Sequence, residues 1–168
     1  METNTEVKTI EDKKKFLKNE LAELFQKLKT DDKGEWGVLN AQQMVEHLSD
    51  SFRNYHGLDS KKIVTPSEQL TKYKEFLMSE KPFKPYTKNI EMPETPLPCR
   101  HPDMQTALKE LKTEVNNFFD YFEEDKNKTL TNVFFGELGF EESVQLLHKH
   151  SMHHLNQFRL IDASPIKK

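Results

Sequence analysis

Histidine supplies the side chains of this sequence that are best suited to chemistry. Four of the seven histidines fall in one short segment, as His148, His150, His153 and His154. Only His150 and His154 are four residues apart, so a helix would place both imidazoles on one face, about one turn apart. Two imidazoles in that arrangement can bind one metal ion if further ligands come from elsewhere. The spacing alone is weak support, because such pairs also arise by chance in histidine-rich helices.

A third ligand would have to come from another helix. His47 is the strongest candidate, because it lies beside the apolar residues Met44 and Leu48 in a segment of helical periodicity. The alternative is a single histidine at the boundary of the core, with no metal. His56 and His101 are weaker candidates, since His56 precedes a glycine at a helix end and His101 can cap the following helix.

The last helix has a polar stripe along the boundary of its apolar face. At about 100° per residue, this stripe contains His150, His154 and Gln157. His148 and His153 fall outside it and are predicted to be surface residues. We expect Gln157 to orient a ligand imidazole, because ring nitrogens that do not bind the metal usually hydrogen bond to a neighbouring acceptor.

Other polar and aromatic side chains near these histidines have two interpretations each. Glu46 and Asp50 can orient an imidazole or can simply face solvent on their helix. Trp36 and Tyr55 can line a pocket or belong to the core. Cys99 is the one cysteine; it can be a nucleophile, but a cysteine in a proline-rich loop is more often incidental, and activation requires a lowered pKa.

The elements that must position these residues are helices. Glycine is rare, strand-like alternation is scarce, and prolines from Pro66 to Pro98 break any long helix in the middle of the chain. A capping box is expected at Asn40 and Gln43. We predict long helices over 10–28, from Asn40 to about Gly57, over 102–124 and over 140–161, a short helix over 67–79, a loop over 125–139, and loose termini at about 1–8 and 162–168. The fold class is therefore all-α: a four-helix bundle with a long crossover between the second and third long helices, in a single domain over 1–168.

Composition excludes several classes of protein. A net charge of −3 argues against a nucleic-acid surface. Near the start of the chain, lysines alternate with acids and are expected to form a solvated helix face: Lys13, Lys14, Lys15 and Lys18. No apolar run approaches the length of a membrane span. The start of the chain lacks the features of a signal peptide, and a single cysteine fits a reducing compartment, so we expect a cytoplasmic protein.

Two segments resemble the DinB/YfiT-like superfamily, most closely a bacterial branch of unknown function. One runs from Trp36-Gly37 through His47 to Leu48, and the other from Phe135-Gly136 through His150 and His154 to Phe158. The resemblance implies a four-helix bundle that holds one divalent metal ion through His47, His150 and His154. Relatives often have His-Pro before the Phe-Gly pair, whereas this chain has Asn132-Val133, which puts a pocket contact there in doubt.

The resemblance also implies the kinds of activity to expect. Members of the superfamily include metal-dependent thiol transferases, an isomerase that uses a low-molecular-weight thiol, and proteins classed as metal-dependent hydrolases. The family name refers to induction by DNA damage and does not imply DNA binding. We therefore expect an enzyme that uses zinc or nickel and acts on a small molecule, as a hydrolase through metal-bound water or as a transferase to a low-molecular-weight thiol. The alternative is a non-catalytic, metal-stabilised bundle that binds a ligand or a protein partner. We also expect a homodimer.

Overall fold

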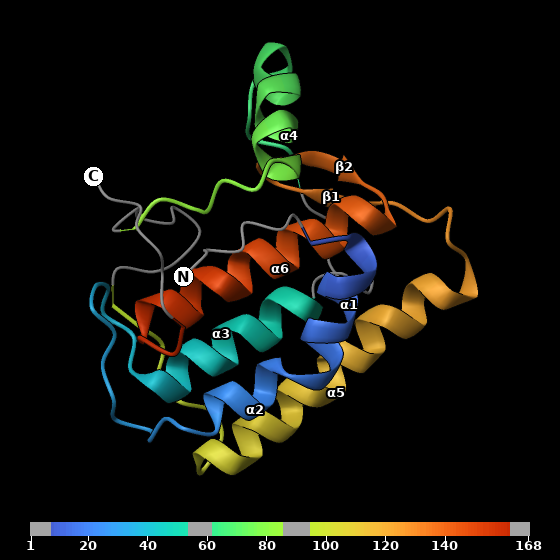
Figure 1. The fold of residues 1–168 in the computed structure, drawn as a ribbon. Coiled ribbons are helices and arrows are strands. Elements are labelled where there is room, and N and C mark those ends of the chain that lie inside the picture. Colours follow the sequence, from blue (N-terminus) through green and yellow to red (C-terminus); the bar gives the residue numbers. More distant parts are fainter. Residues whose placement is uncertain (1–7, 54–61, 86–94, 162–168) are drawn as a thin grey trace, which may run out of the picture.

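The computed structural model describes residues 8–53, 62–85 and 95–161 (Figure 1). Most of these residues lie in helices, as the composition predicts. Within these ranges no helix combines the length and the apolar character needed to cross a bilayer.

The first predicted helix is present but divided in two. Thr9 caps α1 (Ile10–Asn19) in a capping box with Asp12, and α2 (Leu21–Phe25) follows after a break at Glu20. The apolar side chains still follow one stripe across the break, because Leu17, Leu21 and Phe25 are spaced four residues apart and all are buried. Together α1 and α2 act as one member of the bundle.

The second bundle helix, α3 (Ala41–Arg53), begins at the predicted capping box. The Gln43 backbone N–H donates to Asn40 Oδ1 at 2.8 Å, and the Asn40 N–H donates to Gln43 Oε1 at 2.8 Å. The predicted end of this helix near Gly57 lies outside the described residues. Its buried apolar face is formed by Met44, Val45, Leu48 and Phe52.

The third and fourth bundle helices are the longest. α5 (Met104–Glu124) is capped by Asp103, whose carboxylate accepts from the Thr106 N–H at 2.8 Å, so His101 is not the cap. α6 (Phe140–Gln157) ends four residues earlier than predicted. Arg159 takes a left-handed backbone conformation with φ of 59°, and the Leu160 N–H returns to the Leu155 carbonyl at 2.8 Å, which closes the helix.

These helices form the predicted four-helix bundle (Figure 1). α3 packs along α5, α1 packs along α6, and further contacts join α1 and α2 to α5 and α3 to α6. Phenylalanines fill much of the core, with Phe118 in edge-to-face contact with Phe52 at 6.0 Å and with Phe122 at 5.4 Å between ring centroids.

A small hairpin stands where the sequence predicts a loop. β1 (Leu130–Asn132) pairs antiparallel with β2 (Gly136–Leu138), with Leu130 opposite Leu138. Asn132 Oδ1 shapes the turn by accepting from the backbone N–H groups of Phe134 and Phe135 at 2.8 and 2.9 Å. Strands of three residues are too short to show an alternating pattern, which explains the missed prediction.

The short helix predicted within the crossover is α4 (Leu70–Met78), preceded by a 3₁₀ turn (Ser67–Gln69). It projects from the bundle next to the hairpin (Figure 1). The chain before it joins the hairpin turn, because the Val64 N–H donates to the Val133 carbonyl at 2.8 Å.

One of the lysines predicted to be solvated is buried instead. Lys13 is only 2% exposed, and its ammonium donates to Gln145 Oε1 of α6 at 2.7 Å and to Glu80 Oε2, just after α4, at 2.9 Å. These partners come from α6 and from the residues just after α4, so the sequence of α1 alone does not reveal them. Lys15 and Lys18 are exposed, as predicted.

Candidate metal centre

Three histidines from two helices meet at one point. His47 comes from the middle of α3, and His150 and His154 come from successive turns of α6. His150 Nε2 lies 3.2 Å from His47 Nε2 and 3.0 Å from His154 Nε2. In the described part of the chain, this is the one group of three His, Cys, Asp or Glu side chains whose donor atoms could share a metal ion.

The three imidazoles are neutral at physiological pH. His154 is 6% exposed, while His47 and His150 are half-buried. Burial lowers the pKa of all three, well below the ordinary value for His150 and His154, and the nearby histidines lower it further. Neutral rings have a free lone pair on one nitrogen, which is the form that binds metals.

The hydrogen bonds of Gln157 define which nitrogen of His154 has that lone pair. The Gln157 amide nitrogen donates to the Trp36 carbonyl at 2.8 Å, so its Oε1 is the atom that faces His154 Nδ1 at 2.7 Å. An amide oxygen only accepts hydrogen bonds, so Nδ1 must carry the proton. The lone pair of His154 therefore lies on Nε2, which faces the other two histidines.

The donor set fits a divalent metal ion. Bonds of about 2.0–2.1 Å in a tetrahedral site separate ligand nitrogens by about 3.3 Å, close to the observed 3.0 and 3.2 Å. Three neutral imidazoles suit zinc and nickel among other divalent ions, and they leave coordination positions open. The histidines are thus positioned to bind one metal ion.

The two histidines predicted to be surface residues are not fully exposed. His148 is buried against Phe16 of α1, with ring centroids 5.6 Å apart, and its Nε2 has no hydrogen-bond partner. His153 is half-buried between the rings of Trp36 and Phe83, at 5.4 and 6.1 Å. The prediction for His148 was wrong because α1 covers that flank of α6. Neither residue belongs to the group of three.

Glu46 and Asp50 interact with the start of the next segment and have no hydrogen bond to the three rings. Glu46 is 5% exposed and accepts from the backbone N–H groups of Arg100 and His101 at 2.8 and 3.1 Å, so the solvent-facing alternative is wrong for it. Asp50 pairs with the Arg100 guanidinium at 2.9 Å. His101 faces Glu110 at 3.0 Å. These contacts hold the segment before α5 against α3.

Cys99 lies in the segment before α5, where its Sγ is 4.0 Å from Asn40 Oδ1. Burial and the nearby Glu46 carboxylate raise the pKa of Cys99, so its thiol stays protonated at neutral pH. His56 and Tyr55 lie outside the described residues. Asn132 is the last residue of β1 and Val133 begins the hairpin turn.

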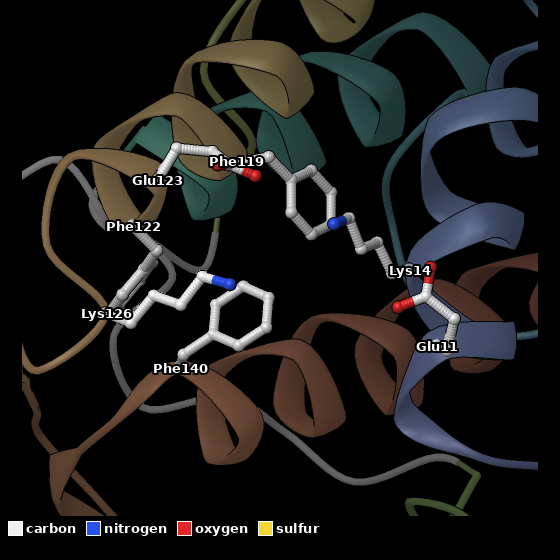
Figure 2. Close-up of a pocket in the computed structure, with 7 residues that line it drawn as sticks. All are labelled: Glu11, Lys14, Phe119, Phe122, Glu123, Lys126 and Phe140. Atoms are coloured by element: carbon white, nitrogen blue, oxygen red, sulfur yellow. The ribbon is translucent and has the colours of Figure 1, made fainter.

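A separate hollow at the other end of α6 contains no histidine. It encloses about 90 Å³ between α1, α5 and the start of α6, with an aromatic floor and a charged rim (Figure 2). The lining residues are Glu11, Lys14, Phe119, Phe122, Glu123, Lys126 and Phe140. From Phe140 to His150 the rise of 1.5 Å per residue gives about 15 Å along the helix axis. This hollow is therefore not part of the histidine site.

Two glycines also belong to the site, although their local sequence does not indicate a contact with it. Gly34 and Gly37 border Gln157 so closely that a Cβ atom on either would lie within 3 Å of its side chain. The sequence shows them only as turn glycines, and their role depends on a contact across more than a hundred residues.

Comparison with known proteins identifies the family of the chain. No curated protein and no solved structure matches the chain significantly. The family model of the DinB superfamily matches residues 17–158, which extend from α1 to the residue after α6 and include all three histidines. The chain belongs to the DinB superfamily.

Proposed function

We propose that this protein is a metal-dependent enzyme whose single divalent ion, zinc or nickel, is bound by His47, His150 and His154. The observation that supports this most strongly is the convergence of three neutral Nε2 atoms within 4.8 Å of one another. Three neutral ligands leave the charge of the ion uncompensated and a coordination position free, which is typical of catalytic rather than structural sites.

The reaction is a hydrolysis or a transfer to a low-molecular-weight thiol. When bound, a divalent ion supplies Lewis acidity that lowers the pKa of a coordinated water or thiol toward neutrality. The protein supplies the geometry: His154 is held by Gln157, and the half-buried His47 and His150 form the side that a small molecule can reach. The His153 ring lies 5.4 Å from the His154 ring and 5.4 Å from the Trp36 ring, and we propose that Trp36 and His153 border the substrate.

Elemental analysis of protein purified without a histidine tag tests the metal site directly. We expect about one metal ion per chain. A content below about half an ion per chain that added zinc or nickel does not restore would contradict the proposal.

A substrate panel separates the two reaction classes. Metal-loaded protein is assayed on esters, amides and electrophilic small molecules, each with and without a small thiol. A hydrolase turns over substrate with water alone, whereas a transferase requires the thiol. Stoichiometric metal without turnover on any substrate would instead favour a metal-stabilised bundle that binds a ligand or partner.

A further inference from the structure

The loop before α3 is closed on itself and reaches the C-terminal end of α6. Lys33 and Asn40 form an antiparallel bridge across its base, and the Ala41 N–H donates to the Asp32 carbonyl at 2.8 Å. This closure fixes the path of the residues between the two ends, so the tip of the loop meets α6 in a defined position.

The tip of this loop, residues 34–37, forms hydrogen bonds with both the backbone and the side chain of Gln157. The Glu35 N–H donates to the Gln157 carbonyl at 2.8 Å, and the Gln157 side-chain amide donates to the Trp36 carbonyl at 2.8 Å. Glu35 also pairs with Arg159, just beyond the end of α6. The amide of Gln157 therefore cannot turn over without losing the bond to Trp36, which is the bond that directs its oxygen toward His154.

Glycines make this close approach possible. A Cβ atom at Gly34 would lie 2.7 Å from Gln157 Cγ and 3.2 Å from the Gln157 carbonyl oxygen. A Cβ atom at Gly37 would lie 2.8 Å from Gln157 Nε2, and Gly37 also has a φ of +83°, which disfavours other residues. By contrast, a Cβ atom at Gly139 would meet nothing within 4 Å.

We propose that residues 34–37 are a positioning element for the histidine site: they hold the Gln157 amide so that it fixes the proton of His154 on Nδ1 and leaves Nε2 free to bind metal. The part that concerns metal binding rests on the function proposed above. The tautomer of His154 is a property of the metal-free protein and can be measured independently.

The experiment uses Gly34→Ala, with Gly139→Ala as the matched control. Gly34 has no left-handed backbone, so the added methyl group acts through its contacts with Gln157 and with the Trp36 carbonyl oxygen that accepts from Gln157. Two-bond ¹⁵N–¹H correlation spectra of the metal-free proteins report the tautomer of each histidine. We expect His154 to carry its proton on Nδ1 in the wild type and in Gly139→Ala, and to lose this preference in Gly34→Ala.

Zinc affinity, measured by competition with a chelator, gives the second readout. Loss of a bond that orients a ligand lowers metal affinity by about 10- to 100-fold, and we expect this for Gly34→Ala and for Gln157→Ala, but not for Gly139→Ala. If the glycine acts through the Gln157 side chain, the double variant Gly34→Ala/Gln157→Ala binds zinc as tightly as Gln157→Ala. A zinc affinity of the double variant that is lower than that of Gln157→Ala by the full effect of Gly34→Ala would overturn the proposal.

The outcomes distinguish this inference from the proposed function. A wild-type protein whose His154 carries its proton on Nε2 would overturn the positioning role without any variant, even if Gly34→Ala fails to fold. Unchanged tautomer and affinity in folded Gly34→Ala would do the same. A wild type that has the expected tautomer but binds no metal would support the positioning of His154 and contradict the metal site.

Discussion

At the scale of single residues, His154 is the histidine whose two ring nitrogens are both assigned by its contacts. Its Nδ1 donates to Gln157 and its Nε2 faces His150, while only 6% of the residue is exposed. A ring so constrained loses little rotational freedom when it binds a metal ion, because the protein has already oriented it. His153, the next residue, contacts aromatic rings and contributes no atom to the group of three.

His154→Ala should therefore abolish metal binding, whereas His153→Ala should leave it largely intact. Removal of a ligand imidazole is expected to cost more than the roughly 10- to 100-fold that loss of a ligand's hydrogen-bond partner costs. Zinc titration of both purified, folded variants is the measurement. Equal effects of the two substitutions would contradict the conclusion that His154 points toward the other two histidines and His153 points away from them.

His148 is expected to make the stability of the fold sensitive to acid. Burial, and secondarily the charge of Lys13, lower its pKa from 6.5 to about 4. Between pH 6.5 and about 4 the unfolded chain binds a proton that the native protein does not, so the free energy of unfolding falls as the pH falls through this window. The full loss is on the order of 3 kcal/mol at 1.36 kcal/mol per pKa unit.

Replacement of this ring by an apolar side chain should flatten that dependence. His148→Leu removes a titrating group whose Nε2 has no partner, so at pH 7 we expect little change in stability. Urea unfolding of the metal-free variant and wild type is compared from pH 7 to pH 4. The other buried histidines titrate in both proteins, so the difference between the two curves reports His148. Parallel curves for the two proteins would show that His148 is not responsible.

At the scale of elements, α6 explains which predictions succeed and which do not. Its stripe of His150, His154 and Gln157 was predicted from helical geometry, and these side chains do lie together in the structure. The same geometry failed for His148, because it assumes one buried face. α6 contacts α1, α3 and α4, and every residue from Ser143 to Lys149 is buried, so its buried surface extends around the helix there. Sequence periodicity cannot reveal how many neighbours a helix has.

Outside α6, short sequence patterns predict only those contacts that join residues close together in the sequence. The capping box of Asn40 and Gln43 spans three residues and was predicted correctly. The contact of Gly34 with Gln157 and the bond of Lys13 to Gln145 span more than a hundred residues, and no pattern near either residue indicates them. The bundle is thus predictable from helix periodicity, while much of the polar support around the site is not.

Lys13 should stabilise the contact between elements, because it joins α1 to Gln145 of α6 and to Glu80, just after α4. Lys13→Met leaves the buried Gln145 Oε1 without its donor, and an unsatisfied buried acceptor costs about 1–3 kcal/mol. Lys15→Met, on the exposed side of the same helix, is the control and should stay within about 0.5 kcal/mol of the wild type. Urea unfolding measures both, and equal values would mean that the buried ammonium contributes nothing.

At the scale of the whole molecule, the histidine site joins parts of the bundle that are distant in sequence. His47 and His150 are 103 residues apart, and the helices that carry them, α3 and α6, lie next to each other in the bundle (Figure 1). A metal ion bound there would cross-link the two helices in the native state only. The unfolded chain would have to close a long loop to make the same site, at a cost in conformational entropy.

Metal binding should therefore stabilise the entire bundle and not only the site. A ligand that binds the native state alone adds about 4 kcal/mol to the free energy of unfolding at a thousandfold excess over its Kd. We expect zinc or nickel to raise the Tm of chelator-treated wild type in a concentration-dependent manner, and a chelator to reverse the shift. His154→Ala should unfold at the same temperature with and without metal, because two imidazoles alone bind weakly. A Tm of the wild type that does not respond to metal, or an equal response of the variant, would show that the three histidines do not form the site.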